Sequence, residues 1–310
     1  MPHRPLVLPQ TELNIYSKQN PVVVPVIESK IATVSYSPNF VRHVVFDVTG
    51  TELEHRVKAG QSLGVIPPGS DDSGKPHSLR LYSVASPSFG EDGNGRHYST
   101  TVKRVIDEHW ESQELFVGVC SNYLCSLKPG DMVSITGPCG KRFILPEDAE
   151  DFNYIFVATG TGIAPFRGMI MDLMRRKPSC SITLIFGCAY RTDLLYDAYF
   201  RQVAKENPNF NYLISISRED PRTDGTKKYV QYQFVDEAAL LNPILKKPNT
   251  LMYICGLKGM EVGIYQTLAL YGHSDYMVFK PGLNSSPDQW TKDEIKKFVK
   301  PSDRMFVETY

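Results

Sequence analysis

The pattern of apolar residues changes near residue 150 of this 310-residue chain, and that change limits the folds open to it. Before it, short runs rich in Val and Ile are separated by Pro, Asn or Gly: 22–27, 31–37, 43–48, 61–66, 80–86, 96–104 and 132–136. Strands at this spacing are typical of an antiparallel barrel or sandwich. After it, apolar runs alternate with segments of helical spacing, which is typical of a parallel sheet covered on both faces.

The second half can be divided into elements from its apolar runs. The expected strands are 154–158, 182–187, 212–217 and 251–255, and the expected helices are 166–176, 194–205, 233–241, 260–271 and 288–299. A final apolar segment, 304–310, is expected to dock as a tail. We therefore predict an N-terminal arm over 1–20, a β-barrel domain over 21–150 and an α/β domain over 151–310.

The composition is that of a globular protein and excludes several functions. Lys plus Arg and Asp plus Glu both number 34, so no global field favours nucleic acid or a membrane surface. No apolar run approaches the roughly 18 residues of a membrane-spanning helix. Six cysteines without a Cys-x-x-Cys pair, and no zinc-like His spacing, predict reduced thiols and no metal site. The N-terminus lacks a signal core, which suits a cytoplasmic protein or a processed organellar one.

Two segments of the first half are candidate anion sites. Arg80 is a cation in an apolar strand, and its planar fork suits a phosphate; Tyr82 could then face a flat ring that carries that phosphate. The alternative is an edge strand with a surface salt bridge. The second segment is a short helix over 123–127, with Ser121 or Asn122 as its N-cap. Its start would favour an anion, although it could equally be a plain linker turn.

A glycine-rich turn follows the first strand of the second half. Thr159-Gly160-Thr161-Gly162 lies between an apolar strand and a helical segment, the geometry that places a phosphate at a helix N-terminus. The spacing is not G-x-G-x-x-G, so that motif is not assigned. The turns 187–191, 217–220 and 255–259 also follow strands. In parallel sheets ligands bind outside the carboxyl ends of the strands, so these turns should share one edge.

Two constellations carry candidate chemistry. The first combines Ser217 and Arg218 with a following loop, and it suits an adenosine 2′-phosphate and its adenine, whereas NAD would favour an acidic residue. The loop members are Lys227, Tyr229 and Gln231. The alternative is an ordinary charged loop.

The second constellation is Ser83, Cys255, Glu308 and Tyr310. One possible role of these residues is hydride transfer between a nicotinamide and a flavin. The reacting atoms then come to about 3–3.5 Å from each other. This calls for small groups beside them and an aromatic ring that covers the flavin face when nicotinamide is absent. The alternatives are a core cysteine and a frayed chain end.

Taken together, these segments resemble the plant-type (plastidic class) ferredoxin–NADP⁺ reductases. The resemblance is carried by 80–86, 118–125, 159–167, 217–219, 255–261 and the ending Glu-x-Tyr, and it runs from about residue 21 to 310. The ending is more similar to the bacterial members. The resemblance implies an antiparallel barrel that binds FAD and a Rossmann-like α/β domain that binds NADP(H). Hydride would pass between NADP(H) and FAD, and single electrons to or from ferredoxin or flavodoxin. A reductase component that feeds an oxygenase, or a non-catalytic flavin sensor, remains the alternative.

The resemblance also implies roles for single residues. Arg80 would hold the FAD pyrophosphate, Tyr82 and Tyr310 would cover opposite flavin faces, and Ser83 would lie near flavin N5. Further FAD contacts would come from Leu81, Thr101, Val102, Lys103, Val119, Cys120 and Ser121. Thr161 would lie between the two cofactors. Contacts to NADP(H) would come from Cys188, Ala189, Ser217, Arg218, Lys227, Tyr229 and Gln231. The nicotinamide path would be lined by Cys255, Gly256 and Leu257, with Glu308 assisting there.

The sequence departs from the family pattern at two places: where the electron-carrier protein would dock, and where the adenine of FAD would bind. An acidic carrier would dock near Lys75, Lys141 and Arg142, but Ser78 stands where the family commonly has a Lys. The family often stacks a Tyr on the FAD adenine at the position of Asp107. The protein is expected to act as a monomer, in a bacterial cytoplasm or, alternatively, in the plastid stroma.

Overall fold

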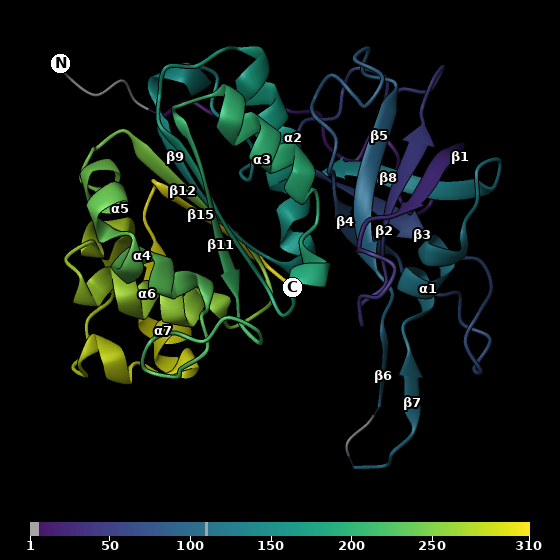
Figure 1. Cartoon of the computed structure of the whole chain (residues 1–310). Helices are drawn as coiled ribbons and strands as arrows, with labels where there is room; N and C mark the ends of the chain where they lie inside the picture. The colour runs from purple at the N-terminus through teal and green to yellow at the C-terminus, as the bar shows by residue number, and fades with distance from the viewer. Residues whose placement is uncertain (1–5, 109–110) are drawn as a thin grey trace. The chain divides into compact units, whose positions relative to one another are not determined.

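The computed structural model describes residues 6–108 and 111–310, and its contacts divide the chain into two units (Figure 1). The barrel unit contains Leu8–Leu145 and Ala164–Arg175. The parallel-sheet unit contains Pro146–Ile163 and Arg176–Tyr310, together with Leu6 and Val7. A single boundary at residue 150 therefore does not describe the contacts, because the helix that follows the glycine-rich turn groups with the first unit.

The described part of the barrel unit is built on a six-stranded antiparallel sheet. In sheet order its strands are β4 (Arg80–Ser83), β3 (Ser62–Ile66), β8 (Met132–Cys139), β1 (Val22–Ile31), β2 (Val41–Asp47) and β5 (His97–Lys103). The two end strands meet, because Val84 bridges Thr100 and the Thr100 hydroxyl donates to the Ser83 carbonyl oxygen at 3.0 Å. The sheet thus closes on itself, and the predicted antiparallel barrel is confirmed.

The barrel core follows from alternation along its strands. On β2 and β5 every second side chain points inward, which brings Val44, Phe46, Tyr98 and Val102 into one buried cluster. The predicted strand over 31–37 is wrong: β1 runs on to Ile31, and a loop follows. Ser37, Pro38 and Asn39 favour that loop, which the Thr33 hydroxyl ties by donating to the Asn39 carbonyl oxygen at 3.0 Å.

A hairpin and a short helix lie between β5 and β8. The hairpin consists of β6 (Ile106–Glu108) and β7 (Leu115–Val117), and the helix is α1 (Val119–Ser126). The helix begins four residues earlier than predicted, and neither Ser121 nor Asn122 is its N-cap. Both side chains instead donate to the carbonyl oxygen of Gly118, the residue that precedes the helix, at 3.1 and 2.9 Å. Satisfying that carbonyl within the first turn favours the longer helix.

The described part of the predicted N-terminal arm lies along the barrel. The N–H groups of Asn14 and Tyr16 donate to the carbonyl oxygens of Pro138 and Gly137, at 2.9 and 3.1 Å. Apart from this bridge, residues 6–20 form no helix or strand, and residues 1–5 of the prediction lie outside the described residues.

The main sheet of the parallel-sheet unit has five strands in the described residues, and all of their pairings are parallel. Their order is β11 (Phe210–Ile216), β10 (Ile182–Cys188), β9 (Asn153–Thr159), β12 (Thr250–Gly256) and β15 (Met305–Thr309). The chain adds strands first on one side of β9 and then on the other. The strand order therefore reverses beside β9, where α/β sheets bind ligands. The predicted α/β domain with a docked last segment is confirmed.

Helices and a small second sheet complete this half of the chain. The helices are α2 (Ile163–Arg175), α3 (Asp197–Glu206), α4 (Gln233–Asp236), α5 (Ala238–Leu245), α6 (Met260–Leu270) and α7 (Lys292–Phe298). Strands β13 (Met277–Phe279) and β14 (Val299–Pro301) pair with each other. The predicted helix over 233–241 is two helices that meet at Glu237.

The two faces of the parallel sheet have different cores. Ile155 and Val157 of β9 pack with apolar residues of α4, α5, α6 and α7. Tyr154 and Phe156 point to the other face, where their rings lie 5.5 Å apart. The Phe306 ring of β15 stacks on Tyr253 of β12 at 4.5 Å. Continuous apolar runs, buried on both faces, are what a parallel sheet requires.

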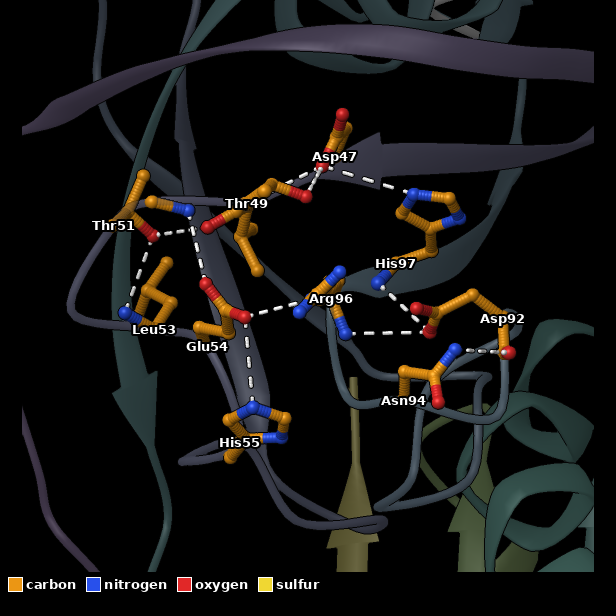
Figure 2. A network of polar contacts seen from close by, with 12 residues as sticks. Asp47, Thr49, Thr51, Leu53, Glu54, His55, Asp92, Asn94, Arg96 and His97 are labelled. Atoms are coloured by element: carbon orange, nitrogen blue, oxygen red, sulfur yellow. Dashed lines mark hydrogen bonds and ion pairs between the residues drawn. The ribbon is translucent and has the colours of Figure 1, made fainter.

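A polar network joins the loop after β2 to the loop before β5 (Figure 2). Glu54 Oε1 lies 2.7 Å from Arg96 Nε, and Asp47 Oδ1 lies 3.7 Å from His97 Nε2. Ion pairs as exposed as these stabilise a fold by about 1 kcal/mol or less. The network thus fixes the conformation of the two loops. Among the described residues, no cluster of three or more His, Cys, Asp or Glu side chains could hold a metal ion. No helix of the described chain is both long and apolar enough to span a bilayer.

A second ionic network is partly buried in the barrel unit, where α2 packs: the side chains of Arg167 and Glu91 are 15% and 19% exposed. Arg167 of α2 donates two hydrogen bonds to the Glu91 carboxylate, at 2.6 and 3.0 Å, and a third to the Ala85 carbonyl oxygen at 2.9 Å. The Ser99 hydroxyl also donates to Glu91, at 2.6 Å. Burial, and then the charge of Arg167, lower the pKa of neighbouring His43 to about 4. His43 is therefore neutral at pH 7, and Arg167 is the cation that compensates Glu91.

Replacing Arg167 by Met is expected to lower the free energy of unfolding by up to about 3 kcal/mol, because a mostly buried carboxylate loses its partner. Urea unfolding at pH 7 measures this. Arg176→Met is the matched control: its partner Glu150 is 54% exposed, so a loss below about 1 kcal/mol is expected. Equal losses in the two variants would contradict the assigned role of the pair of Arg167 and Glu91.

Candidate functional site

Three predicted residues of the barrel unit lie together at the start of β4. Arg80 is exposed there, and Tyr82, two residues on, points to the same side of the strand. Burial raises the pKa of Tyr82, and the nearby Cys120 thiol adds to this, while the charge of Arg80 opposes it. Burial raises the pKa of Cys120 against the hydrogen bond from Tyr82 and the charge of Arg80. The structure therefore brings Arg80, Tyr82 and Cys120 into one group.

The first turn of α1 adds backbone donors to this group. The N–H groups of its first residues have no acceptor within the helix, and they carry its positive dipole end. The side chains here are engaged: the Cys120 thiol donates to the Val65 carbonyl oxygen at 3.8 Å, and the Ser121 hydroxyl accepts from the Val105 N–H at 3.3 Å. What this turn offers a ligand is therefore its backbone, which together with Arg80 suits a diphosphate.

The other predicted residues of the barrel unit are more dispersed. Ser83 ends β4, where its carbonyl oxygen accepts from Thr100, and Leu81 is exposed. Thr101 and Val102 are buried on β5, so they can offer a ligand only backbone groups, while Lys103 is exposed at the end of the strand.

In the parallel-sheet unit, six predicted residues meet at the carboxyl edge of β9, β12 and β15. The Tyr310 hydroxyl lies 2.5 Å from Thr161 Oγ1, and the Tyr310 N–H donates to the Gly256 carbonyl oxygen at 3.0 Å. Cys255 is the register partner of Glu308. Leu257 follows at the edge with an exposed side chain. One edge of the sheet thus gathers Thr161, Cys255, Gly256, Leu257, Glu308 and Tyr310.

Two glycines allow this close approach. A Cβ on Gly162 would lie 2.2 Å from the Cys255 carbonyl oxygen, and a Cβ on Gly256 would lie 2.1 Å from Thr159 Oγ1. The Thr159 hydroxyl oxygen also accepts from the Leu257 N–H at 3.1 Å. The glycine-rich turn and the end of β12 are therefore in direct backbone contact, with no room for a side chain between them.

The two titratable groups of this edge have shifted pKa values. Burial raises the pKa of Glu308 to about 7. Burial and the charge of Glu308 raise the pKa of the Cys255 thiol well above its ordinary range. The thiol is consequently neutral, and Glu308 changes charge near neutral pH, which is typical of functional carboxyl groups.

A second group lies where β10 and β11 end. The N–H of Ser217 donates to the Cys188 carbonyl oxygen and that of Arg218 to the Ala189 carbonyl oxygen, both at 3.0 Å. The Arg218 guanidinium donates to the Tyr190 hydroxyl at 2.9 Å and lies 5.4 Å from the centre of its ring. The pKa of Arg218 is raised by Tyr190 and, more weakly, by Tyr229.

The loop after β11 supplies the remaining predicted residues. Lys227 and Tyr229 are exposed, and a β-bridge between Pro221 and Lys227 closes the loop. The Gln231 side chain lies against Gly263, where a Cβ would come within 2.7 Å of Gln231 Nε2. Two exposed cations and an exposed ring thus stand at one sheet edge.

Sequence reasoning missed Tyr190, although it lies in a turn that was assigned to the binding edge. The available signal was an aromatic residue two positions after the end of β10. The residues predicted to dock a carrier, Lys75, Lys141 and Arg142, are exposed in loops of the barrel unit.

Comparison with known proteins identifies the family. Residues 156–266 match the family model described as "Oxidoreductase NAD-binding domain". The chain is 38% identical to a ferredoxin–NADP reductase of Spirulina sp. over 306 residues, which cover 96% of this chain and 98% of that one. It is 39% identical to the chloroplastic leaf isozyme 1 of ferredoxin–NADP reductase from Arabidopsis thaliana over 287 residues, 90% and 78% of the two chains.

Solved structures agree on the fold. A ferredoxin–NADP⁺ reductase from Plasmodium falciparum superposes with a TM-score of 0.70 over 99% of this chain and 100% of that one, at 24% identity. The same protein with 2′P-AMP gives a TM-score of 0.69 over 96% and 99%. Together with the full-length similarity in sequence, this confirms the predicted resemblance: the chain belongs to the ferredoxin–NADP reductase family.

Proposed function

We propose that the chain is a flavoprotein ferredoxin–NADP⁺ reductase that passes hydride between NADP(H) and FAD and exchanges single electrons with ferredoxin or flavodoxin. The enzyme class and both cofactors agree with the family to which the chain belongs. The observation that carries the proposal is the carboxyl edge of β9, β12 and β15, where Thr161, Glu308 and Tyr310 meet beside a glycine-rich turn. Bound FAD would supply the coupling between two-electron and one-electron steps.

In the barrel unit the residues fit the phosphate and ring parts of FAD. Arg80 and the N–H groups at the start of α1 would bind the pyrophosphate, since both favour an anion. The Tyr82 ring would cover a face of the flavin, and the Ser83 hydroxyl would stand at its edge. The backbone of Thr101 and Val102, with the Lys103 side chain, would contact the adenosine half.

In the parallel-sheet unit the residues fit a phosphorylated nicotinamide nucleotide. Arg218 and Lys227 would pair with the 2′-phosphate, aided by the Ser217 hydroxyl, and Tyr229 would stack on the adenine. Further NADP(H) contacts would come from Cys188, Ala189 and Gln231. Cys255, Gly256 and Leu257 would line the nicotinamide position, and Tyr310 would supply the ring that nicotinamide displaces. Glu308 holds a proton on its carboxyl group below about pH 7 and carries a charge above it.

The carrier, the assembly state and the compartment are also part of the proposal. An acidic carrier would be steered to the exposed cations Lys75, Lys141 and Arg142. The protein would act as a monomer, in the cytoplasm of a bacterium or, as the alternative, in the plastid stroma.

The absorption spectrum of the purified protein and its reduction by NADPH test this function. We expect a yellow protein with one FAD per chain, and turnover that becomes fast when ferredoxin or flavodoxin is added. A colourless protein that takes up no FAD would contradict the flavoprotein. A protein that reduces ferricyanide but neither carrier would instead be the reductase of another acceptor.

The same assay tests the docking residues. Lys141→Glu combined with Arg142→Glu should lower kcat/KM for ferredoxin at least tenfold at low salt, because steering is lost, while ferricyanide reduction stays unchanged. Lys246→Glu combined with Lys247→Glu, at an exposed pair directly after α5, changes the net charge by the same amount and is the control for a change in net charge alone. If the control and the variant at Lys141 and Arg142 lose the same activity, or if added salt leaves the difference intact, the docking site is wrongly assigned.

A further inference from the structure

The β6–β7 hairpin has several large apolar side chains that are exposed. It extends away from the strands of the barrel (Figure 1), and all six residues of its two strands are exposed. Among them, Phe116 is 49% and Leu115 is 72% exposed. Exposed apolar side chains that adjoin one another in a patch can mark a binding surface.

The base of this hairpin is tied to the first turn of α1. The Gly118 N–H donates to the Val105 carbonyl oxygen at 3.0 Å, and the Val105 N–H donates to the Ser121 hydroxyl at 3.3 Å. The Asn122 amide donates to the same Val105 carbonyl oxygen at 2.8 Å. The hairpin therefore starts from the helix end that was assigned above to the FAD pyrophosphate.

One face of the hairpin is directed toward that helix end. Asp107 is the register partner of Phe116, so their side chains share a face, and alternation puts Val105 and Gly118 on it too. A Cβ on Gly118 would lie 2.7 Å from Ser121 Oγ, which shows that this face looks toward α1. Leu115 belongs to the opposite face.

The distances along the strand suit a nucleotide. Phe116 lies two residues from Gly118, about 6.6 Å along an extended strand. A ribose separates phosphate and base by a comparable length. A diphosphate at the start of α1 would thus place its adenine beside the pair formed by Asp107 and Phe116.

Of that pair, only Phe116 has a flat apolar face. The Asp107 carboxylate accepts a hydrogen bond from the Glu108 N–H at 2.9 Å. We propose that Phe116, on β7, supplies the aromatic platform on which the adenine of FAD stacks, in place of a ring at position 107 on β6. This inference rests on the proposed flavoprotein function, since it names the residue that binds the distal half of the cofactor.

The affinities of the apoprotein for FAD and for FMN test the platform. FMN lacks the adenosine half, so the ratio of the two dissociation constants isolates its contribution. Stacking of a base on an aromatic ring contributes about 1–3 kcal/mol. Phe116→Ala should therefore raise the Kd for FAD about 5- to 150-fold and leave the Kd for FMN unchanged. Fluorescence titration of the deflavinated protein measures both constants.

Three further variants complete the test. Phe116→Tyr should keep the FAD preference, and Phe116→Leu, which keeps apolar volume without a π face, should lose most of it. Leu115→Ala removes a neighbouring side chain from the opposite face and should change neither constant. An FAD-to-FMN ratio that is the same in Phe116→Ala and the unmodified protein would overturn the platform, as would an equal loss in Leu115→Ala. A protein that binds neither flavin would overturn the proposed function instead.

Discussion

The Arg218→Ala variant is expected to lose 10- to 150-fold in kcat/KM for NADPH while its kcat/KM for NADH stays the same. Hydrogen bonds to a charged group contribute about 1.5–3 kcal/mol, and only NADPH carries the 2′-phosphate that would receive them. The Arg218 guanidinium is already oriented, because it donates to the Tyr190 hydroxyl at 2.9 Å and lies over its ring. Steady-state kinetics with ferricyanide as acceptor measure both constants without a protein carrier.

Arg191→Ala is the matched control for this experiment. Arg191 lies at the same sheet edge and is also exposed, but its guanidinium is paired with Asp220 at 2.5 Å. A guanidinium held by a carboxylate has little left for a phosphate, so the NADPH-to-NADH ratio should change less than threefold. An equal fall for both nucleotides in Arg218→Ala would indicate damage to the fold and contradict the 2′-phosphate site.

The second large effect is expected at Glu308. A nicotinamide ring becomes positively charged as hydride leaves it, so a carboxylate beside it stabilises the transition state. Loss of one such stabilising group commonly costs about 10²-fold in rate. Glu308→Gln should accordingly lower the rate of flavin reduction by NADPH about 100-fold, as measured by stopped-flow absorbance. Because the pKa of Glu308 is about 7, the unmodified rate should rise with pH through neutrality, and that rise should be absent in the variant.

Stability gives a readout of Glu308 that does not depend on activity. Its pKa is raised from 4.5 in the unfolded chain to about 7 in the fold, so the folded state binds the proton more tightly. The stabilisation is complete below pH 4.5 and is lost as pH rises through 7. The Tm of the unmodified protein should therefore fall between about pH 5 and 7 relative to Glu308→Gln, and the difference should level off above pH 7. Asp303→Asn, at an exposed carboxylate before β15, should leave both pH profiles intact.

Much of the fold was predictable because local pattern and final burial agree. The strand over 154–158 is apolar at every position, as a strand buried on both faces must be. The barrel strands coincide with short runs rich in Val and Ile that Pro, Asn or Gly separate. Closure of the barrel could not be predicted from local sequence, because it depends on a bridge between Val84 and Thr100, which lie at the two ends of the sheet. The grouping of α2 with the barrel was hidden for the same reason: Arg167 and Glu91 are separated by 76 residues.

The candidate site was predictable where backbone topology alone brings residues together. Parallel strands end at one edge, so Thr161, Cys255 and Glu308 had to approach each other once the strand order was known. Roles that depend on which way a side chain faces were less accessible. Val102 points into the core, and Ser121 bonds to the backbone beside it, so neither side chain is available to a ligand. Tyr190 was missed because its function depends on Arg218, 28 residues later.

The close contact at Gly162 and Gly256 has a consequence for redesign. Any side chain there would meet backbone or the Thr159 hydroxyl at little over 2 Å, so these two positions tolerate no variation. The exposed loop that holds Lys227 and Tyr229 is under no such constraint. Coenzyme preference should thus be open to laboratory evolution through that loop, while the reacting end of the nucleotide keeps its geometry.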